Sequence, residues 1–384
     1  MNLLSLVPEI QNFPNHWKVI PFDDAIEDIT GGNSKVKQSD YKSSGALAVI
    51  DQGKDQIAGY VDDLSLRCKV NLPVVLFGDH TKILKFVTEP FALGADGVKV
   101  LAPCPDLDAK FVYFYLQLVR FPTGTGYSRH FKYLKAIKVP VPPTKDEQHR
   151  IAAILDKADA IRRKRQESIR LTEEFLRSTF LEMFGDPVTN PKGWDKVPIK
   201  ELGDVMTGNT PSREVQEYYG EGIEWIKSDN INTHFHYLTE AKEYLTSAGQ
   251  KVGRIVPANS TLVTCIAGSP ECIRNAAIAN RPVAFNQQIN AVTPFKGTDP
   301  YFLYVQILVA KKLIQGQSTE SMKGMVNKGK FENISFLKPP ANLQADFGKI
   351  FIHFHGMIQK ADSANQKSSN LFNSLSRRAF RGEL

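Results

Sequence analysis

Two long stretches of this chain space their apolar residues as a helix does. The first, residues 144–184, contains neither Pro nor Gly and directly follows Pro142-Pro143, where the chain cannot yet be helical. Thr144 and Glu147 stand at the spacing of a capping box, in which a hydroxyl and a carboxylate satisfy free amides at a helix start. Roughly forty residues at ~1.5 Å each make a helix of about 60 Å, longer than ordinary globular helices. The pattern predicts a spacer helix or half of a coiled coil.

The second stretch follows Pro339-Pro340 and runs to about Phe380, with apolar positions that mostly alternate steps of three and four residues. The first stretch has a matching apolar stripe at one constant spacing, which later lengthens by about one helical turn. Two helices that each have an apolar stripe bury it most simply against each other. We therefore predict that these side chains pack between the two helices: Ile151, Ile154, Leu155, Ala158, Ile161, Phe347, Ile350, Phe354, Met357, Leu371 and Leu375.

The sequence outside the long helices is also repeated. Matching residues recur at one constant spacing: Trp17, Pro21, Thr30 and Gly31 correspond to Trp194, Pro198, Thr207 and Gly208. In both halves, short β-branched apolar runs alternate with Gly, Asp and Pro, which predicts strands joined by turns. Near the end of each half a longer apolar run, 111–119 or 301–308, favours a buried helix instead. A repeat on this scale indicates two copies of one fold.

The order of these patterns determines the expected architecture. The first helix delivers the chain to the second domain at its far end, and the second helix leaves that domain in the equivalent way, so it must run back. We predict an α+β fold of two strand-rich domains separated by two long antiparallel coiled-coil helices, with a pseudo-two-fold internal repeat. The predicted parts are a first domain (1–143), a central helix (144–185), a second domain (186–340) and a C-terminal helix (341–384).

Composition and charge narrow the class of protein. The 384 residues are 42% hydrophobic, which suffices for two to three domains with real cores. The net charge of +7 favours, without requiring, a polyanionic partner such as nucleic acid. The four cysteines show no metal-ligand spacing, so we predict reduced thiols in a cytoplasmic protein and no metal site. The apolar N-terminal run lacks the basic region of a signal peptide, and no apolar run approaches membrane-spanning length.

A polar, basic and glycine-rich segment follows the first apolar helix. Gly124 and Gly126 would let backbone amides approach a phosphate, although no Walker-type Gly-Lys-Ser/Thr follows them. Arg129, His130 and Lys132 alternate with aromatic residues, a pattern suited to phosphate contact and base stacking. An exposed loop whose aromatic residues anchor it to its own core explains the same pattern equally well.

The second half has a different polar loop in the matching place. Framework positions agree between the halves while loop sequences differ, as expected of one scaffold that recognises two targets, although neutral drift of surface loops has the same result. Gln, Asn, Arg and Lys are the usual readers of base edges. The candidate DNA-contacting residues of this half are Gln287, Gln288, Gln317, Lys323 and Lys328.

From Trp17 onward the chain resembles the DNA-specificity subunit of a type I restriction–modification system. The resemblance rests on the two-fold repeat and on the pattern Pro-x-Pro-Pro-x-x-x-Glu-Gln-x-x-Ile at residues 140–151. It also rests on the endings Phe-Leu-Glu-Met-Phe at 180–184 and Ala-Phe-Arg-Gly-Glu-Leu at 379–384. At the start of the second helix, the sequence Ala-Asn-Leu-Gln at 341–344 replaces the fuller Glu-Gln form, so docking of partners there is expected to differ.

The resemblance implies a non-catalytic, sequence-specific DNA-binding subunit. Each of two target-recognition domains would recognise one half of a bipartite, asymmetric site in double-stranded DNA, and the helices would set the spacer between the halves. Two methyltransferase (modification) subunits would dock on the helices, and restriction (translocase) subunits would join the larger complex. This chain would hold no cofactor, because S-adenosylmethionine, ATP and Mg are expected on the partner subunits.

Other functions remain open from the sequence. An amino-methyltransferase needs an aromatic residue after Asn/Asp-Pro-Pro, whereas here the two Pro-Pro pairs are followed by Thr144 and Ala341. Glu240 and Lys242 resemble the end of a nuclease metal motif, but no Pro-Asp pair stands at a suitable distance before them. A structural coiled-coil adaptor without a DNA role, or the specificity subunit of a related combined restriction–methylation enzyme, also fits the pattern.

Overall fold

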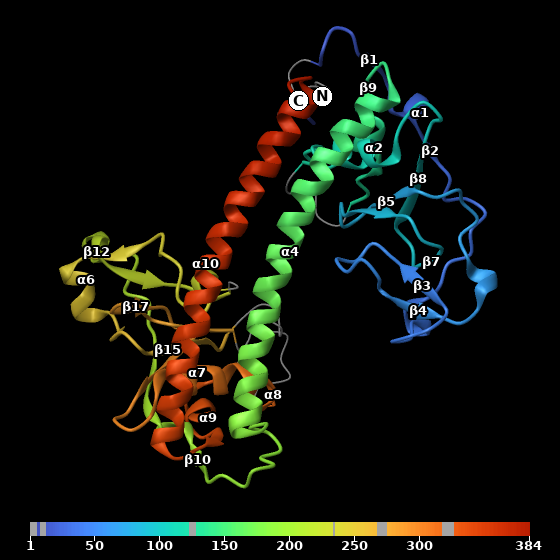
Figure 1. Ribbon diagram of the computed structural model, residues 1–384. Coiled ribbons are helices and arrows are strands. Elements are labelled where there is room, and N and C mark those ends of the chain that lie inside the picture. Colours follow the sequence, from blue (N-terminus) through green and yellow to red (C-terminus); the bar gives the residue numbers. More distant parts are fainter. Residues whose placement is uncertain (1–5, 8–12, 123–127, 233–234, 267–274, 317–325) are drawn as a thin grey trace. The chain divides into compact units, whose positions relative to one another are not determined.

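The structure is a computed structural model, and it describes residues 6–7, 13–122, 128–232, 235–266, 275–316 and 326–384. The chain divides into unit 1, residues 1–166 with 364–384, and unit 2, residues 167–363. Each unit contains one strand-rich domain and the parts of both long helices that pack on it. Figure 1 shows the two long helices, α4 (Lys145–Phe184) in green and α10 (Ala341–Phe380) in red.

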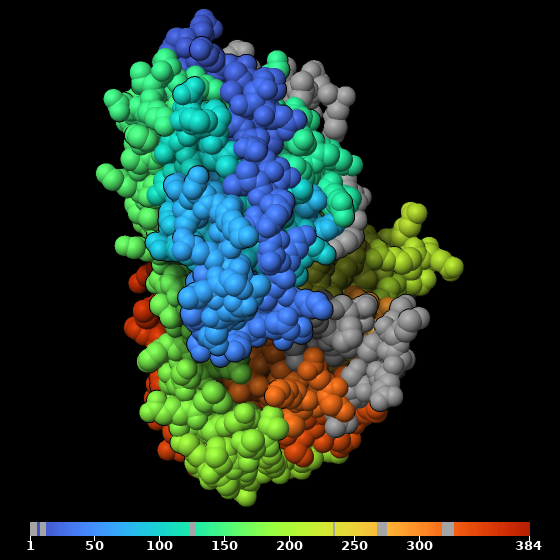
Figure 2. Space-filling model, turned by 90° about the vertical axis from the view of Figure 1, so that its right-hand side faces the viewer, coloured from blue at the N-terminus to red at the C-terminus, as the bar shows by residue number. Residues whose placement is uncertain are grey.

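The domain of unit 1 is built mainly from short strands. In chain order its elements are β1 (Lys18–Pro21), α1 (Phe22–Ala25), β2 (Ile26–Asp28), β3 (Leu47–Ile50), β4 (Gly59–Val61), β5 (Val74–Gly78), β6 (Leu84–Val87), β7 (Phe91–Leu93), β8 (Val98–Pro103), α2 (Ala109–Leu116), α3 (Phe131–Lys135) and β9 (Lys138–Val141). The strands form sheets in the orders β2-β8-β5-β6, β4-β3-β7 and β1-β9. Figure 2 shows the surface of this domain, where dark-blue residues from its beginning lie against cyan and green residues from later in the chain.

The core of this domain explains why these residues form these elements. All five residues of β5 are buried, as its continuous apolar run requires of a central strand with both faces covered. Asp108 precedes α2 and accepts a hydrogen bond from the Phe111 amide at 2.8 Å, which caps the helix. The fully buried rings of Phe111 and Tyr115 then pack on Phe380 of α10, with ring centres 5.1 and 5.3 Å apart. The predicted apolar helix is therefore the contact between domain and long helix.

The domain of unit 2 repeats this plan. Its elements are β10 (Lys196–Pro198), β11 (Gly203–Thr207), β12 (Tyr219–Ile226), α5 (Ser228–Ile231), β13 (Tyr244–Leu245), α6 (Ser247–Val252), β14 (Ile255–Val256), β15 (Thr261–Thr264), β16 (Ala276–Ile278), β17 (Val283–Phe285), β18 (Ile289–Pro294), α7 (Pro300–Val309), α8 (Lys311–Gln315), α9 (Lys328–Glu332) and β19 (Ser335–Leu337). Its sheet orders are β11-β18-β15-β16, β13-β12-β17-β14 and β10-β19. These match the sheets of unit 1 in order, except that the second sheet has a fourth strand, β14, so the predicted internal repeat and α+β fold are confirmed.

The two long helices pack against each other within each unit. In unit 1, Arg150 near the start of α4 donates to the carbonyl of Leu384 at 2.7 Å, and Arg165 further along α4 donates to Ala364 and Ser368. Later α4 residues thus meet earlier residues of the C-terminal segment, which makes the two helices antiparallel. In unit 2, Phe175 and Phe184 of α4 lie 5.3 and 5.6 Å from the rings of Phe354 and Phe347, respectively, in the same antiparallel sense.

The residues of the predicted packing stripe differ in burial. Ile151, Leu155, Ala158 and Phe347 are buried, and Ile154, Ile350, Phe354 and Leu375 are partly buried. The prediction of burial is wrong for three positions, because Ile161, Met357 and Leu371 are 48%, 46% and 54% exposed.

The buried face of α10 lies one position further along the helix. Phe351 and Phe372 are 0% and 5% exposed, and Ile358 is also buried. Phe351 stacks on Tyr301 of α7 with ring centres 4.7 Å apart, and Phe372 contacts Phe114 of α2 at 6.0 Å. In each unit α10 therefore buries a face shared between α4 and the domain of that unit, which shifts the stripe away from a simple two-helix seam. Within the described part of the chain, no helix is both long and apolar enough to span a membrane.

Candidate nucleic-acid interface

Strand pairing brings the ends of three strands of the first domain to one edge. β3 and β7 are parallel, with Ile50 opposite Leu93, so both strands end there. β5 ends at the same edge, because Gly78 pairs with Val98 at the start of β8. Loops at the carboxyl ends of parallel strands are a common place for ligand binding. We name this group of loops edge 1, with residues 51–53, 79–82, 94–97 and 128–132.

Gln52 connects the loops of edge 1. Its Nε2 donates to the carbonyl of Asp96 at 3.0 Å, and its Oε1 accepts from the His80 amide at 3.3 Å. The Thr81 hydroxyl donates to the Gln52 carbonyl at 2.7 Å. Gln52, His80 and Lys82 were not predicted from the sequence. The signal that would have found them is their position in the polar segments that follow the short apolar runs 47–50 and 74–77.

Asp79 joins the segment 128–132 to this edge. Its amide donates to the carbonyl of Gly97 at 2.6 Å, and its own carbonyl accepts from the His130 amide at 2.8 Å. Its carboxylate, in a side chain that is 5% exposed, accepts from the Phe131 amide at 2.7 Å. The basic segment predicted from sequence therefore lies beside the turn between β7 and β8.

Two of the three residues predicted in this segment are exposed. Arg129 is exposed and close enough to Asp96 to contribute to the lowered pKa of that carboxyl, after the larger effect of Lys35. Lys132 on α3 is also exposed, and its ammonium lies 5.2 Å from the centre of the Tyr133 ring. Both cations are therefore available to a ligand at edge 1. The predicted glycines Gly124 and Gly126 lie outside the described residues.

The third predicted residue, His130, is corrected by the structure. Its side chain is 1% exposed, so as placed it cannot contact DNA. The ring stacks on Tyr133 with centres 6.0 Å apart and meets the edge of Phe121 at 5.9 Å. The basic and aromatic residues of this segment thus have two different structural roles. Arg129 and Lys132 face solvent, while His130 and the aromatic rings anchor the segment to the core.

The second domain has an equivalent edge. β12 and β17 are parallel, with Ile226 opposite Phe285, and β15 ends where Thr264 pairs with Ile289 at the start of β18. We name this group of loops edge 2, with residues 209–210, 227–228, 265–266, 286–288 and 326–328. It occupies the same topological place as edge 1 but carries different side chains.

Gln287 and Gln288 lie in the β17–β18 turn of edge 2. Gln287 is exposed and accepts a hydrogen bond from the Thr210 hydroxyl. The Oε1 atom of Gln288 accepts from the Ser228 hydroxyl at 3.1 Å and from the Asn286 amide group at 3.3 Å. Both predicted residues therefore belong to one polar cluster, in which neighbours from three loops hold the amide groups in place.

Lys328 also belongs to edge 2. The amide of Val326 donates to the carbonyl of Cys265 at 2.9 Å, which brings the segment before α9 to the end of β15. Lys328 is exposed, and its ammonium lies 3.9 Å from the carboxylate of Glu332, a pair weak enough to exchange for a phosphate. The two remaining predicted residues, Gln317 and Lys323, lie outside the described residues.

A cluster of cations and aromatic rings stands next to edge 2 and was not anticipated from the sequence. The Arg213 guanidinium lies 4.2 Å from the Tyr219 ring centre, and the Lys227 ammonium lies 5.1 Å from that of Trp225. Both cations pair with Glu243, and Lys227 has the larger part in lowering the pKa of that carboxyl. These residues share no sequence motif, and the pairing of β12 with β13 brings them together.

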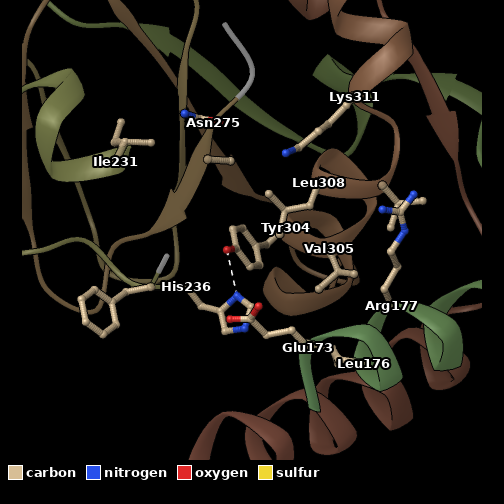
Figure 3. A pocket seen from close by; sticks show the side chains of 13 residues that line it. Glu173, Leu176, Arg177, Ile231, His236, Asn275, Tyr304, Val305, Leu308 and Lys311 are labelled. Carbon is tan, nitrogen blue, oxygen red and sulfur yellow. Dashed lines mark hydrogen bonds between the residues drawn. The ribbon is translucent and has the colours of Figure 1, made fainter. Parts of the chain in front are cut away.

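Elsewhere in unit 2, a cavity of about 300 Å³ lies between α4, α7 and residues near α5 and β16 (Figure 3). His236 Nδ1 lies 3.0 Å from the Tyr304 hydroxyl, and burial lowers the pKa of His236 to about 4, so the ring is neutral at pH 7. Its ring also contacts those of Phe351 and His355 on α10, at 5.2 and 6.0 Å. This histidine therefore joins α10 to the domain. Across the described residues, no three His, Cys, Asp or Glu side chains are grouped to hold a metal ion.

The fold and both edges define a protein with two copies of one recognition scaffold that differ in their polar loops. A family model described as the type I restriction modification DNA specificity domain matches residues 14–172 and 191–364, one match for each copy. The chain therefore belongs to this family, whose members are non-catalytic subunits.

Individual relatives agree with this assignment. The chain is 25% identical over 290 residues to the EcoR124I/EcoR124II specificity subunit of Escherichia coli, covering 71% of this chain and 70% of that protein. It is 24% identical over 199 residues to the HindI specificity subunit of Haemophilus influenzae, covering 50% of this chain and 42% of that protein. In fold it resembles the crystal structure of a type I restriction–modification S subunit from M. genitalium, with a TM-score of 0.57, 15% identity, and coverage of 96% and 97% of the two chains.

Proposed function

We propose that this chain recognises a bipartite, asymmetric site in double-stranded DNA, with edge 1 contacting one half and edge 2 the other. The observation that carries the proposal is the pair of edges at the same topological place. Edge 1 presents Arg129 and Lys132, whereas edge 2 presents Gln287 and Lys328. Different side chains on one scaffold favour two different half-sites, because base recognition depends on the donors and acceptors presented to the groove.

The residues at each edge suit two kinds of contact. Arg pairs with guanine and Gln with adenine through two hydrogen bonds, whereas Lys mainly neutralises phosphate. We therefore assign base contact to Arg129 and Gln287, and phosphate contact to Lys132 and Lys328. Gln287 is exposed and accepts one hydrogen bond, whereas Gln288 is only partly exposed and its carbonyl oxygen accepts two, from Ser228 and Asn286. Gln288 therefore contributes by holding the turn that carries Gln287.

The long helices would connect the two recognition events and dock partner subunits. Membership of the family supports two methyltransferase subunits on the helices and restriction subunits in a larger complex. S-adenosylmethionine, ATP and Mg would then be bound by those partners, acting on DNA in the cytoplasm. The half-exposed apolar side chains Ile161, Met357 and Leu371 offer contact area for such a partner without being needed for the cores of the two units.

The decisive experiment is a map of DNA methylation. The chain is expressed with its neighbouring methyltransferase subunit, and N6-methyladenine is mapped by long-read sequencing. Methylation in one split, asymmetric motif that disappears when this chain is omitted is the expected result. Methylation that persists unchanged without the chain would remove the specificity role and favour a structural adaptor.

Matched variants connect each edge to its half-site. Arg129→Ala should relax one half of the motif and Gln287→Ala the other, each by roughly ten-fold at the base concerned. Lys132→Ala should weaken binding at all sequences alike and reduce the salt dependence of binding. Lys42→Ala, which removes an exposed cation paired with Asp62 near the start of β3, serves as the control for loss of charge alone. If both Arg129→Ala and Gln287→Ala leave the motif unchanged, the edges are not the recognition surfaces.

A further inference from the structure

Building on the proposed DNA recognition by edge 1, we propose that Asp79 is a positioning residue for the first half-site. Its carboxylate does not face the ligand; it holds the backbone that carries Arg129. The inference concerns how this domain keeps a base-reading side chain in one orientation, and it rests on the hydrogen bonds of a single buried residue.

Asp79 binds the recognition segment and the neighbouring turn at the same time. Its amide donates to Gly97 at 2.6 Å and its carbonyl accepts from His130 at 2.8 Å, so the main chain alone joins three loops. The carboxylate adds a bond of 2.7 Å from the Phe131 amide. Asp79 directly follows Gly78, the last residue of the fully buried strand β5, which makes this a rigid support.

The carboxylate supplies a partner that the segment itself does not provide. His130 stands at the N-cap position of α3 but makes no side-chain capping bond, because its ring is turned into the core. The Phe131 amide would otherwise be a buried donor without an acceptor, which is unfavourable. Arg129 is two residues from that amide, so its main chain is fixed by the bonds to His130 and Phe131 together.

The second domain keeps the backbone part of this arrangement and changes the side-chain part. Cys265 stands where Asp79 does: its amide donates to Gln288 at 2.8 Å, and its carbonyl accepts from Val326 at 2.9 Å. There the side chain of Asn327 caps α9 by accepting from the Lys330 amide at 2.9 Å. A capping side chain is thus present in both domains, but only in the first does it come from the central strand. Asn327 therefore provides a matched control.

The effect of removing the carboxylate follows from geometry. Two parallel hydrogen bonds from one guanidinium to a base tolerate little displacement, since a site about 1 Å too loose loses its selectivity. Asp79→Leu keeps the approximate size of the side chain but cannot accept the Phe131 hydrogen bond. We expect it to relax the first half-site by roughly ten-fold at the base contacted by Arg129 and to leave the second half-site unchanged. Asp79→Asn keeps an acceptor oxygen and should restore most of the discrimination.

The test uses the full methyltransferase complex on a library in which every base of both half-sites is varied singly. Asp79→Leu, Asp79→Asn, Arg129→Ala and the double variant Asp79→Leu/Arg129→Ala are scored for methylation at each base. If Asp79 acts through Arg129, the double variant should be no more relaxed than Arg129→Ala. Asn327→Ala, which removes the cap of the helix that begins with the phosphate-contacting Lys328, should leave the first half-site unchanged.

The outcomes separate this proposal from the one on which it rests. If Arg129→Ala changes nothing, the assignment of Arg129 as a reader fails and the positioning role fails with it. If Arg129→Ala relaxes the first half-site but Asp79→Leu does not, only the positioning role is overturned. Relaxation of both half-sites by Asp79→Leu would indicate general loss of structure and would also overturn it. Should that variant fail to assemble, Asp79→Ser, whose side chain is one atom shorter, is scored by the same criteria.

Discussion

Gln148 of α4 accepts a hydrogen bond from the amide of Asp108 at 2.7 Å, and Gln148 is 1% exposed. Its Nε2 donates to the carbonyl of Asp106 at 3.0 Å, so both ends of its side-chain amide are engaged. Asp108 in turn caps α2. In unit 2, Gln344 of α10 accepts from the amide of Asp299 at 3.1 Å, and Asp299 caps α7. Each long helix thus has a buried glutamine that is hydrogen-bonded to the capping residue of a domain helix. Gln148 of α4 binds Asp108, the cap of α2, and Gln344 of α10 binds Asp299, the cap of α7.

Replacing either glutamine should destabilise its own unit. Gln148→Ala and Gln344→Ala each remove the partner of one main-chain amide and one main-chain carbonyl, and we expect each to cost about 1–3 kcal/mol of unfolding free energy. The exposed Gln166 of α4 provides a control, since Gln166→Ala should change stability by less than about 0.5 kcal/mol. Urea unfolding followed by fluorescence measures the differences. Equal effects for the three variants would refute the anchoring role.

Two glycines inside α10 should respond in opposite ways to alanine. An added Cβ at Gly348 would overlap the carboxylate of Asp299, which cannot retreat without breaking its bonds to the amides of Tyr301 and Phe302. An added Cβ at Gly356 meets open space. Alanine normally stabilises a helix interior by about 1 kcal/mol relative to glycine.

We therefore expect Gly356→Ala to raise the thermal midpoint of unfolding and Gly348→Ala to lower it. The two effects have opposite signs because only at Gly348 does a neighbouring side chain, the carboxylate of Asp299, occupy the space that the added Cβ would need. Differential scanning calorimetry of the two variants decides the point. A stabilising Gly348→Ala would show that the contact between α10 and the cap of α7 is loose.

Stability should fall in mildly acidic solution because of His236. Burial lowers its pKa from 6.5 to about 4, so between these values the unfolded chain binds a proton that the folded chain does not. The contribution of the neutral ring to the free energy of unfolding is complete above pH 6.5. It is lost as the pH falls from 6.5 to about 4, at about 1.4 kcal/mol per pH unit. Burial also lowers the pKa of the neighbouring His355, which acts in the same direction.

His236→Gln tests this expectation, because glutamine does not titrate and can still accept from the Tyr304 hydroxyl. The variant should show a shallower loss of unfolding free energy between pH 7 and pH 5 than the wild-type chain. Urea unfolding at intervals across this range gives both slopes. Identical slopes would mean that His236 is accessible to solvent protons in the folded state.

The corrected face of α10 predicts a contrast between neighbours. Phe372 is 5% exposed and contacts Phe114, whereas Leu371 is 54% exposed. Phe372→Ala should cost about 3–5 kcal/mol of unfolding free energy, as for other buried aromatic residues. Leu371→Ala should cost less than about 1 kcal/mol if nothing covers it in the isolated subunit. A larger loss for Leu371→Ala would mean that Leu371 packs between the two long helices, as the sequence predicts.

The sequence by itself determined the features that depend on local pattern. The internal repeat, the long helix after Pro142-Pro143 and the buried helices ending each domain all follow from periodicity and chain-breaking residues. The hydroxyl of Thr144 caps α4 as predicted, accepting from the Glu147 amide at 3.2 Å. The other half of the expected capping box is used differently, because the Glu147 carboxylate accepts from the indole of Trp17 at 3.1 Å instead.

Only the tertiary structure decided which residues from distant segments meet. Arg129 and Lys132 were found from the sequence because basic residues are conspicuous, but the burial of His130 depends on Phe121 and Tyr133 closing over it. Gln52 became part of the same edge because a parallel strand pair places its loop beside another one. In the same way, a period of seven residues identifies an apolar stripe, but the face that is buried depends on every element that packs there. Periodicity is a property of one segment, whereas burial depends on the whole set of neighbours.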